Sequence, residues 1–236
     1  MRVVFIHGAF VRDGAWWWAP TASLLAKHGI TSDAVVLPSC GETGTPPTGS
    51  GPTLTDDAAA ATAVLDQGGP AVVVALSYGG MVATQAADHP AVRHLVYISS
   101  FLPNIGDSVV ALASTTNPVP VQPHPDGSVS VRVDDRAVFD NRFLHDVTDA
   151  GLVREAHARL TAQSSAVFSA EVTAAAWQNI PSTYLVCADD RSTSPALQRV
   201  HAVRATHTVE LPTGHHPFLS RPDLVAASIR NIASAD

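Results

Sequence analysis

Short runs of Val, Ile and Leu recur along the chain between helix-like stretches, and this alternation constrains the fold more than any other feature. The runs at 72–76 and 95–98 are continuously apolar, as is typical of strands buried on both faces of a sheet. We predict strands at 2–6, 34–37, 71–76, 94–98, 183–187 and 207–211, and helices at 15–28, 55–67, 79–88, 196–204 and 223–233. Strands that alternate with helices are joined by right-handed crossovers, so the pattern predicts an α/β fold with a mostly parallel, six-stranded sheet flanked by helices.

Two segments interrupt the alternation. Residues 38–53 form a loop rich in Gly and Pro, and residues 101–181 are too long for a simple connection between strands. Within the longer segment, Asp126-Gly127 precedes the alternating run 128–133 and predicts a hairpin, whereas roughly 141–177 is expected to be helical. This segment carries apolar residues of its own, so we interpret it as an inserted cap over the active site. The predicted division is a core of residues 1–100 and 182–236 with a cap of residues 101–181.

Composition excludes several classes of protein. Of the 236 residues, 46% are hydrophobic, enough for a large core and too many for a disordered chain. The net charge of −7 argues against a nucleic-acid partner, because nucleic-acid binders normally present a basic face. No apolar run approaches the roughly 18 residues of a membrane-spanning helix, so no membrane partner is expected.

Cysteine content and the N-terminus suggest where the protein resides. Cys40 and Cys187 are the only cysteines and cannot build a disulfide framework, so we interpret them as reduced thiols. The N-terminus enters a strand-like run without a signal-peptide pattern, which together with the thiols predicts a cytoplasmic location. Lys27 is the only lysine and alanine is abundant, which favours a GC-rich bacterial source.

Reactive side chains follow four of the predicted strands. In chain order these sequences are His7-Gly8-Ala9, Ser77-Tyr78, Asp189-Asp190 and His215-His216. Ligands bind outside the carboxyl ends of the strands in an open parallel sheet, so we expect these groups to converge on one edge. A hydroxyl, carboxylates and imidazoles in the order Ser, Asp, His are the groups needed for nucleophilic acyl transfer.

Ser77 lies where a strand is expected to turn sharply into a helix. A nucleophilic serine on such a turn needs small residues two positions before and after it, usually in the pattern G-x-S-x-G. Ala75 and Gly79 meet this requirement, with alanine at the first position. The alternative is an ordinary turn capped by Ser77, but the flanking strand and helix favour the nucleophile.

Each of the two doublets can supply only one residue to the site. We favour Asp190 as the acid that orients the histidine, and Asp189 remains the alternative. The preceding Gly214 favours His215 as the base, which leaves His216 as a pocket or surface residue. No His-Glu-x-x-His or paired Cys/His spacing is present, so we expect no metal at these residues.

An oxyanion hole requires two backbone N–H groups directed at the developing negative charge. We expect one from Tyr78, at the start of the helix after Ser77, and the other from Ala9, in the loop after the first strand. Gly8 allows that loop to approach closely. His7 is better interpreted as a structural histidine that holds the loop.

These motifs resemble those of α/β-hydrolases, in particular the branch with plant methyl esterases, hydroxynitrile lyases and related bacterial esterases. The matching stretches are Val3-Val4-Phe5-Ile6-His7-Gly8-Ala9 with Gly14-Ala15-Trp16, Leu76-Ser77-Tyr78-Gly79-Gly80, Tyr184 to Arg191, and Gly214-His215-His216-Pro217-Phe218. The resemblance covers nearly the whole chain. It implies Ser77 as nucleophile, His215 as base and Asp190 as acid, Ala9 and Tyr78 as oxyanion donors, and a cap at 101–181. Hydroxynitrile lyases of this branch carry a threonine and a lysine where this chain has Gly8 and His216, which favours ester hydrolysis.

The sequence therefore predicts a serine carboxylesterase for small, fairly apolar esters or lactones, with no cofactor. Two alternatives remain: a lyase or cofactor-free oxygenase that uses His215 as its base, and a ligand-binding relative with little turnover. The oligomeric state is left open, a homodimer included. Candidate pocket residues are Phe10, Phe139, Phe143, Phe168, Trp177, His216 and Phe218.

Overall fold

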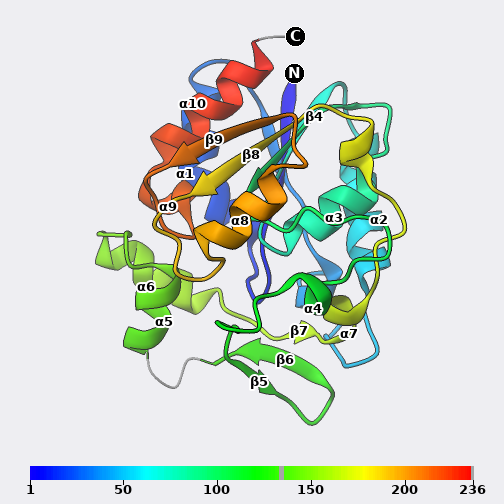
Figure 1. The fold of residues 1–236 in the computed structure, drawn as a ribbon, viewed down its shortest axis with the longest axis vertical. Coiled ribbons are helices and arrows are strands. Elements are labelled where there is room, and N and C mark those ends of the chain that lie inside the picture. The colour runs from blue at the N-terminus through cyan, green and yellow to red at the C-terminus, as the bar shows by residue number, and fades with distance from the viewer. Residues whose placement is uncertain (133–135, 235–236) are drawn as a thin grey trace.

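The computed structural model describes residues 1–132 and 136–234. Its centre is a six-stranded parallel sheet in the order β2-β1-β3-β4-β8-β9, which runs through the upper part of the molecule in Figure 1. The strands are β1 (Arg2–Ile6), β2 (Ser32–Ala34), β3 (Ala71–Leu76), β4 (Val92–Ile98), β8 (Ser182–Cys187) and β9 (His207–Leu211). This sheet confirms the predicted fold class.

Helices cover both faces of the sheet. One face packs against α1 (Gly14–Ala26), α9 (Pro217–Ser220) and α10 (Pro222–Ala233), with Trp18 and Ile229 buried against Phe5. The other face packs against α2 (Leu54–Asp66), α3 (Gly79–Ala86) and α8 (Pro195–Ala202), with Leu65 buried in the same cluster as Val4. The sheet is thus buried between two helical layers, which accounts for its apolar strands.

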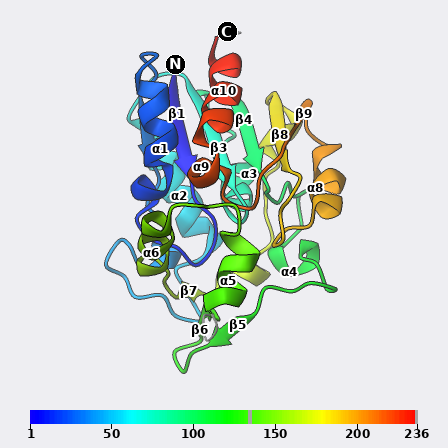
Figure 2. The ribbon, with the colours of Figure 1, turned by 90° about the vertical axis from the view of Figure 1, so that its left-hand side faces the viewer.

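The segment between β4 and β8 forms short elements of its own. They are α4 (Val109–Leu112), β5 (Val121–Pro123), β6 (Ser128–Val131), α5 (Arg136–Phe143), α6 (Ala150–Ala158), β7 (Gln163–Ser164), α7 (Ala166–Ser169) and the 3-10 turn η2 (Ala176–Gln178). The three strands make a small antiparallel sheet in the order β5-β6-β7. Figures 1 and 2 show the elements from α4 to α7 at the end of the molecule opposite both termini, where the strands of the large sheet end.

Some sequence expectations differ from the structure in detail. The run 34–37 is apolar because Val35 and Leu37 are buried, but the paired strand β2 begins two residues earlier, at Ser32. The predicted hairpin forms as β5 and β6, and Val133, at the end of the predicted run, lies outside the described residues. The stretch 141–177 is only partly helical, because β7 within it pairs with β6.

Both cysteines are buried free thiols, and burial raises the pKa of Cys40 and of Cys187. Within residues 1–132 and 136–234, every helix is too short or too polar to cross a membrane.

Candidate active site

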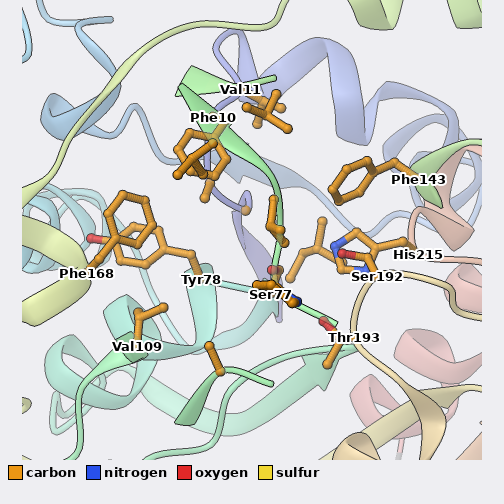
Figure 3. A pocket seen from close by; sticks show the side chains of 18 of the residues that line it. Phe10, Val11, Ser77, Tyr78, Val109, Phe143, Phe168, Ser192, Thr193 and His215 are labelled. Atoms are coloured by element: carbon orange, nitrogen blue, oxygen red, sulfur yellow. The ribbon is translucent and has the colours of Figure 1, made fainter. Parts of the chain in front are cut away.

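A cavity of about 430 Å³ lies where the strands of the large sheet end. Ser77 and His215 both line it, and Figure 3 shows them facing one another near its centre. More than half of the lining residues belong to the segment 101–181. The principal apolar side chains of the wall are Phe10, Val11, Trp17, Leu76, Phe101, Val109, Val119, Val129, Val131, Phe139, Phe143, Leu160 and Phe168.

Ser77 occupies the sharp turn between β3 and α3. Its backbone is in the left-handed region, with φ at +52°, which costs free energy for a residue other than glycine and is typical of functional sites. Two residues later, a Cβ on Gly79 would lie 2.6 Å from the carbonyl oxygen of His7, so only glycine fits the close approach of α3 to β1. The sequence Ala75-x-Ser77-x-Gly79 therefore produces the strained turn that presents the hydroxyl to the cavity.

His215 is held by one member of the preceding aspartate doublet. Its Nδ1–H donates to Oδ2 of Asp190 at 2.8 Å, and both side chains are buried. With the proton on Nδ1, Nε2 is the ring nitrogen able to accept a proton. Asp189 is exposed, so the structure brings Asp190 and not Asp189 to the imidazole.

The carboxylate of Asp190 accepts further hydrogen bonds. Its Oδ1 accepts from the backbone N–H of Ser192 at 2.7 Å and of Thr193 at 3.1 Å, and its Oδ2 accepts from Gln198 Nε2 at 3.0 Å and from the Ser99 hydroxyl. Burial opposes ionisation, but His215 and these hydrogen bonds outweigh it and lower the pKa of Asp190.

Ser99 was not among the predicted site residues. It follows β4 with φ at +42°, and its hydroxyl oxygen also lies 3.1 Å from Nδ1 of His215. The strand-end rule that singled out Ser77 applies equally to Ser99, since it directly follows the predicted strand 94–98. Gln198 carried no comparable signal, because it reaches Asp190 from the middle of helix α8.

The backbone N–H groups of Ala9 and Tyr78, beside Ser77, have no partner among the described residues. Both residues line the cavity. The N–H of Phe10, by contrast, donates to Gln163 Oε1 at 3.0 Å and is therefore occupied. Unpaired N–H groups that face a cavity can stabilise a developing oxyanion.

Five of the seven predicted pocket residues line the cavity, and two do not. Trp177 instead packs against the core and donates from its indole N–H to the Pro103 carbonyl at 2.7 Å. Phe218 packs against Trp18, with ring centroids 4.2 Å apart. Both are large apolar residues that the core absorbs. The five that line the cavity are Phe10, Phe139, Phe143, Phe168 and His216.

His216 is a neutral part of the wall. Its Nδ1–H donates to the Phe143 carbonyl at 2.9 Å, and its ring stacks on Trp17. Burial, followed by the neighbouring His215, lowers the pKa of His216 to about 3.

His7 does not reach the cavity wall, and its Nε2 lies 3.2 Å from Glu42 Oε1.

The walls of the cavity carry no formal charge. None of the described residues that line it is Asp, Glu, Lys or Arg. In the part of the chain that the structure describes, no three His, Cys, Asp or Glu side chains come together as metal ligands. A hydroxyl, an imidazole backed by a carboxylate, and unpaired N–H groups in an apolar cavity are the parts of a nucleophilic acyl-transfer site.

The sequence is similar to those of known hydrolases. A sequence model described as the alpha/beta hydrolase family matches residues 3–228. The chain is 30% identical over 251 aligned positions to alpha/beta hydrolase nvfD of Aspergillus novofumigatus, covering 98% of this chain and 96% of that protein. It is 35% identical over 119 positions to a carbendazim hydrolyzing esterase of Nocardioides sp., covering 46% of each chain.

Solved structures share the fold. A pyrethroid hydrolase from Sphingobium faniae superposes with a TM-score of 0.84 at 22% identity, covering 100% of this chain and 98% of that one. A methylesterase from Arabidopsis superposes with a TM-score of 0.77 at 17% identity, covering 100% of both chains. Plant methylesterases thus stand among the structural neighbours, as the resemblance in sequence predicted.

Proposed function

The chain belongs to the alpha/beta hydrolase family, and from this premise we propose that it is a serine carboxylesterase for small, apolar esters or lactones. One observation carries the proposal. Ser77 and His215 face the same apolar cavity, and Asp190 accepts a hydrogen bond from Nδ1–H of His215 at 2.8 Å. The nucleophile, its base and the group that orients the base are therefore in the order that acyl transfer needs.

Acylation begins when the Ser77 hydroxyl attacks the ester carbonyl while Nε2 of His215 takes its proton. The carbonyl oxygen becomes an oxyanion and accepts hydrogen bonds from the N–H groups of Ala9 and Tyr78. The bond to the alcohol then breaks, and the imidazolium of His215 returns the proton to the leaving oxygen. The acyl group remains on Ser77.

Deacylation repeats these steps with water as the nucleophile. His215 takes a proton from water, the new oxyanion occupies the same two N–H groups, and Ser77 leaves with the proton from His215. The lowered pKa of Asp190 keeps this carboxylate ionised at neutral pH, where it stabilises the imidazolium.

The lining of the cavity defines the proposed substrate class. Without a cation or an anion among its described lining residues, the cavity offers no partner to a charged group, and burial of an unpaired charge is costly. The substrate is accordingly uncharged on both sides of the carbonyl. Segment 101–181 supplies much of the wall, and we propose that it acts as the cap of the site.

The test is Ser77→Ala. We expect kcat for a p-nitrophenyl ester to fall by about 10⁴-fold or more, and labelling by a fluorophosphonate probe to disappear. Ser228→Ala, on α10 and away from the cavity, serves as the control and should keep both activities. Near-wild-type turnover by Ser77→Ala would contradict the acyl-enzyme and indicate chemistry that uses His215 alone.

A further inference from the structure

A buried network of hydrogen-bonded polar groups links segment 101–181 to the turn that carries Ser77. Gln163 accepts from the Phe10 N–H at 3.0 Å and donates from Nε2 to the Ser39 hydroxyl at 2.9 Å. The Ser39 hydroxyl and N–H donate to the two carboxylate oxygens of Asp57, at 2.6 and 2.9 Å. Asp57 Oδ2 also accepts from the Tyr78 hydroxyl at 2.6 Å.

Every side chain in this network is almost completely shielded from solvent. Gln163, Ser39 and Asp57 are each 0% exposed, and Tyr78 is 1% exposed. Polar groups at such depth are costly unless they are fully hydrogen-bonded, and apolar residues could fill the same space without that requirement. A fully satisfied buried network, however, fixes the relative positions of the segments that contribute to it.

The two ends of this network lie beside the unpaired N–H groups of Ala9 and Tyr78. At one end, Tyr78 directly follows Ser77 and carries one free N–H on its own backbone. At the other end, Gln163 holds the N–H of Phe10, whose φ of +64° places it in the left-handed region. With the Phe10 amide turned toward Gln163, the preceding Ala9 N–H is left unpaired beside Ser77.

The loop after β1 is also bound to segment 101–181 through its backbone. Val11 pairs with Leu160 as an isolated antiparallel bridge, and the N–H of Thr161 donates to the Phe10 carbonyl at 2.9 Å. Gln163 therefore adds side-chain hydrogen bonds at the end of a backbone pairing that already aligns the loop. The loop conformation depends on a residue more than 150 positions away in sequence.

We propose that Gln163, Ser39 and Asp57 are positioning residues that hold the Ala9 and Tyr78 N–H groups in the geometry of the oxyanion hole. This inference rests on the proposed function of the site. It gives segment 101–181 a role in the chemical step, through Gln163, in addition to its contribution to the cavity wall.

Gln163→Met tests the proposal, because methionine keeps the length of the side chain and removes both hydrogen bonds. The chain offers a matched control in Gln85, which also makes two hydrogen bonds to segment 101–181, to the hydroxyl and the N–H of Thr173, each at 2.7 Å. Gln85 does not line the cavity and is not part of the buried network. Gln85→Met therefore removes a comparable attachment without touching the oxyanion hole.

We expect Gln163→Met to lower kcat by about 10- to 100-fold with KM changed less than about twofold, since loss of a whole oxyanion donor costs about 10²–10³-fold. Affinity for a trifluoromethyl ketone, which forms an oxyanion on Ser77, should fall by a similar factor. Affinity for the corresponding alcohol, which forms none, should not change. Gln85→Met should leave all of these values near those of the wild type.

Amide hydrogen exchange gives a readout that does not depend on activity. Exchange in the peptide that contains Phe10 should accelerate in Gln163→Met and not in Gln85→Met. If Gln163→Met fails to fold, Tyr78→Phe provides a second test, because it removes only the hydroxyl at the other end of the network. We expect kcat to decrease by about 3- to 10-fold, with a loss of affinity for the ketone and none for the alcohol.

Two results would overturn the proposal. One is a kcat for Gln163→Met, or for Tyr78→Phe, equal to that of Gln85→Met. The other is an equal loss of affinity for the ketone and the alcohol, which would indicate a merely structural role. Full activity in Ser77→Ala would instead contradict the proposed function itself, so the two failures can be distinguished.

Discussion

Two aspartate doublets serve the two sides of Ser77, and each contains one exposed and one buried member. Asp189-Asp190 follows β8 and places Asp190 on His215, whereas Asp56-Asp57 opens α2 and places Asp57 on the Tyr78 hydroxyl. Asp189 and Asp56 are exposed. Figure 3 shows His215 and Tyr78 on different sides of Ser77.

The buried members differ in what surrounds them. Burial raises the pKa of Asp57, and the hydrogen bonds from Ser39 and Tyr78 offset it only in part. For Asp190 burial is outweighed by His215 and the hydrogen bonds, and the pKa is lowered. Similar burial thus gives opposite shifts, because Asp190 has an imidazole to pair with and Asp57 has chiefly neutral hydroxyls. The contrast suggests that one carboxylate acts through its charge and the other through its position.

The largest expected effect comes from Asp190→Asn, which should lower kcat by up to about 10⁴-fold. The substitution removes the charge that stabilises the imidazolium and allows the amide to favour the wrong tautomer of His215. Steady-state kinetics with a p-nitrophenyl ester would measure it. A loss of less than tenfold would show that catalysis does not depend on the charge of Asp190, and Asp190 and Asp57 would then not differ in the way described.

Asp57→Asn should have a smaller effect, about 10- to 100-fold on kcat, because it disturbs the placement of oxyanion donors without removing one. The amide keeps one oxygen acceptor but must present a donor to Ser39 or Tyr78. The same assay would measure kcat and KM. A loss as large as that of Asp190→Asn would show that the two carboxylates do not differ in the way described.

Stability should depend on pH with opposite sign for the two residues. The lowered pKa of Asp190 gives the wild type a stability advantage over Asp190→Asn that is fully present above about pH 4 and is lost as pH falls through the folded pKa. The raised pKa of Asp57 makes the wild type lose stability relative to Asp57→Asn as pH rises from about 4 through the folded pKa. Urea unfolding of the three proteins between pH 3 and 7 measures both differences, and equal signs would contradict this interpretation.

The smallest effects on activity should come from the exposed members. Asp189→Asn and Asp56→Asn should each keep kcat within about twofold, since surface substitutions rarely matter unless they remove a specific contact. Asp56 forms a capping box with Thr53 at the start of α2, so its loss should reduce stability by about 0.5–2 kcal/mol. Thermal unfolding would record that change, and a large loss of activity in either variant would end the distinction between buried and exposed members.

The sheet could be predicted from sequence because its strands are buried on both faces. A run such as 71–76 must then be apolar at every position, and the residues that follow it must lie at one edge. That rule located Ser77, and it led to the aspartate and histidine doublets that follow β8 and β9 of the same sheet. The sequence analysis favoured Asp190 over Asp189, the resemblance to α/β-hydrolases implied the same acid, and the structure places Asp190 on His215.

The segment 101–181 was harder to predict, because its elements are short and depend on partners far away in sequence. Strand β7 has two residues and no periodicity, and only its pairing with β6 defines it. Gln163 lies in that strand, so nothing local indicated its contact with Phe10. Trp177 was expected in the pocket as an apolar residue of the cap, and Phe218 because it follows the histidine doublet, but a large apolar side chain suits the core equally well.

The uncharged cavity wall has a consequence for the end of the catalytic cycle. Hydrolysis converts a neutral ester into a carboxylate, which is ionised at neutral pH. The described wall residues include no Lys or Arg to pair with that charge, so the acid product is poorly matched to the space that held its precursor. The same feature that admits an apolar ester therefore favours departure of the acid, and turnover should be little inhibited by accumulated product.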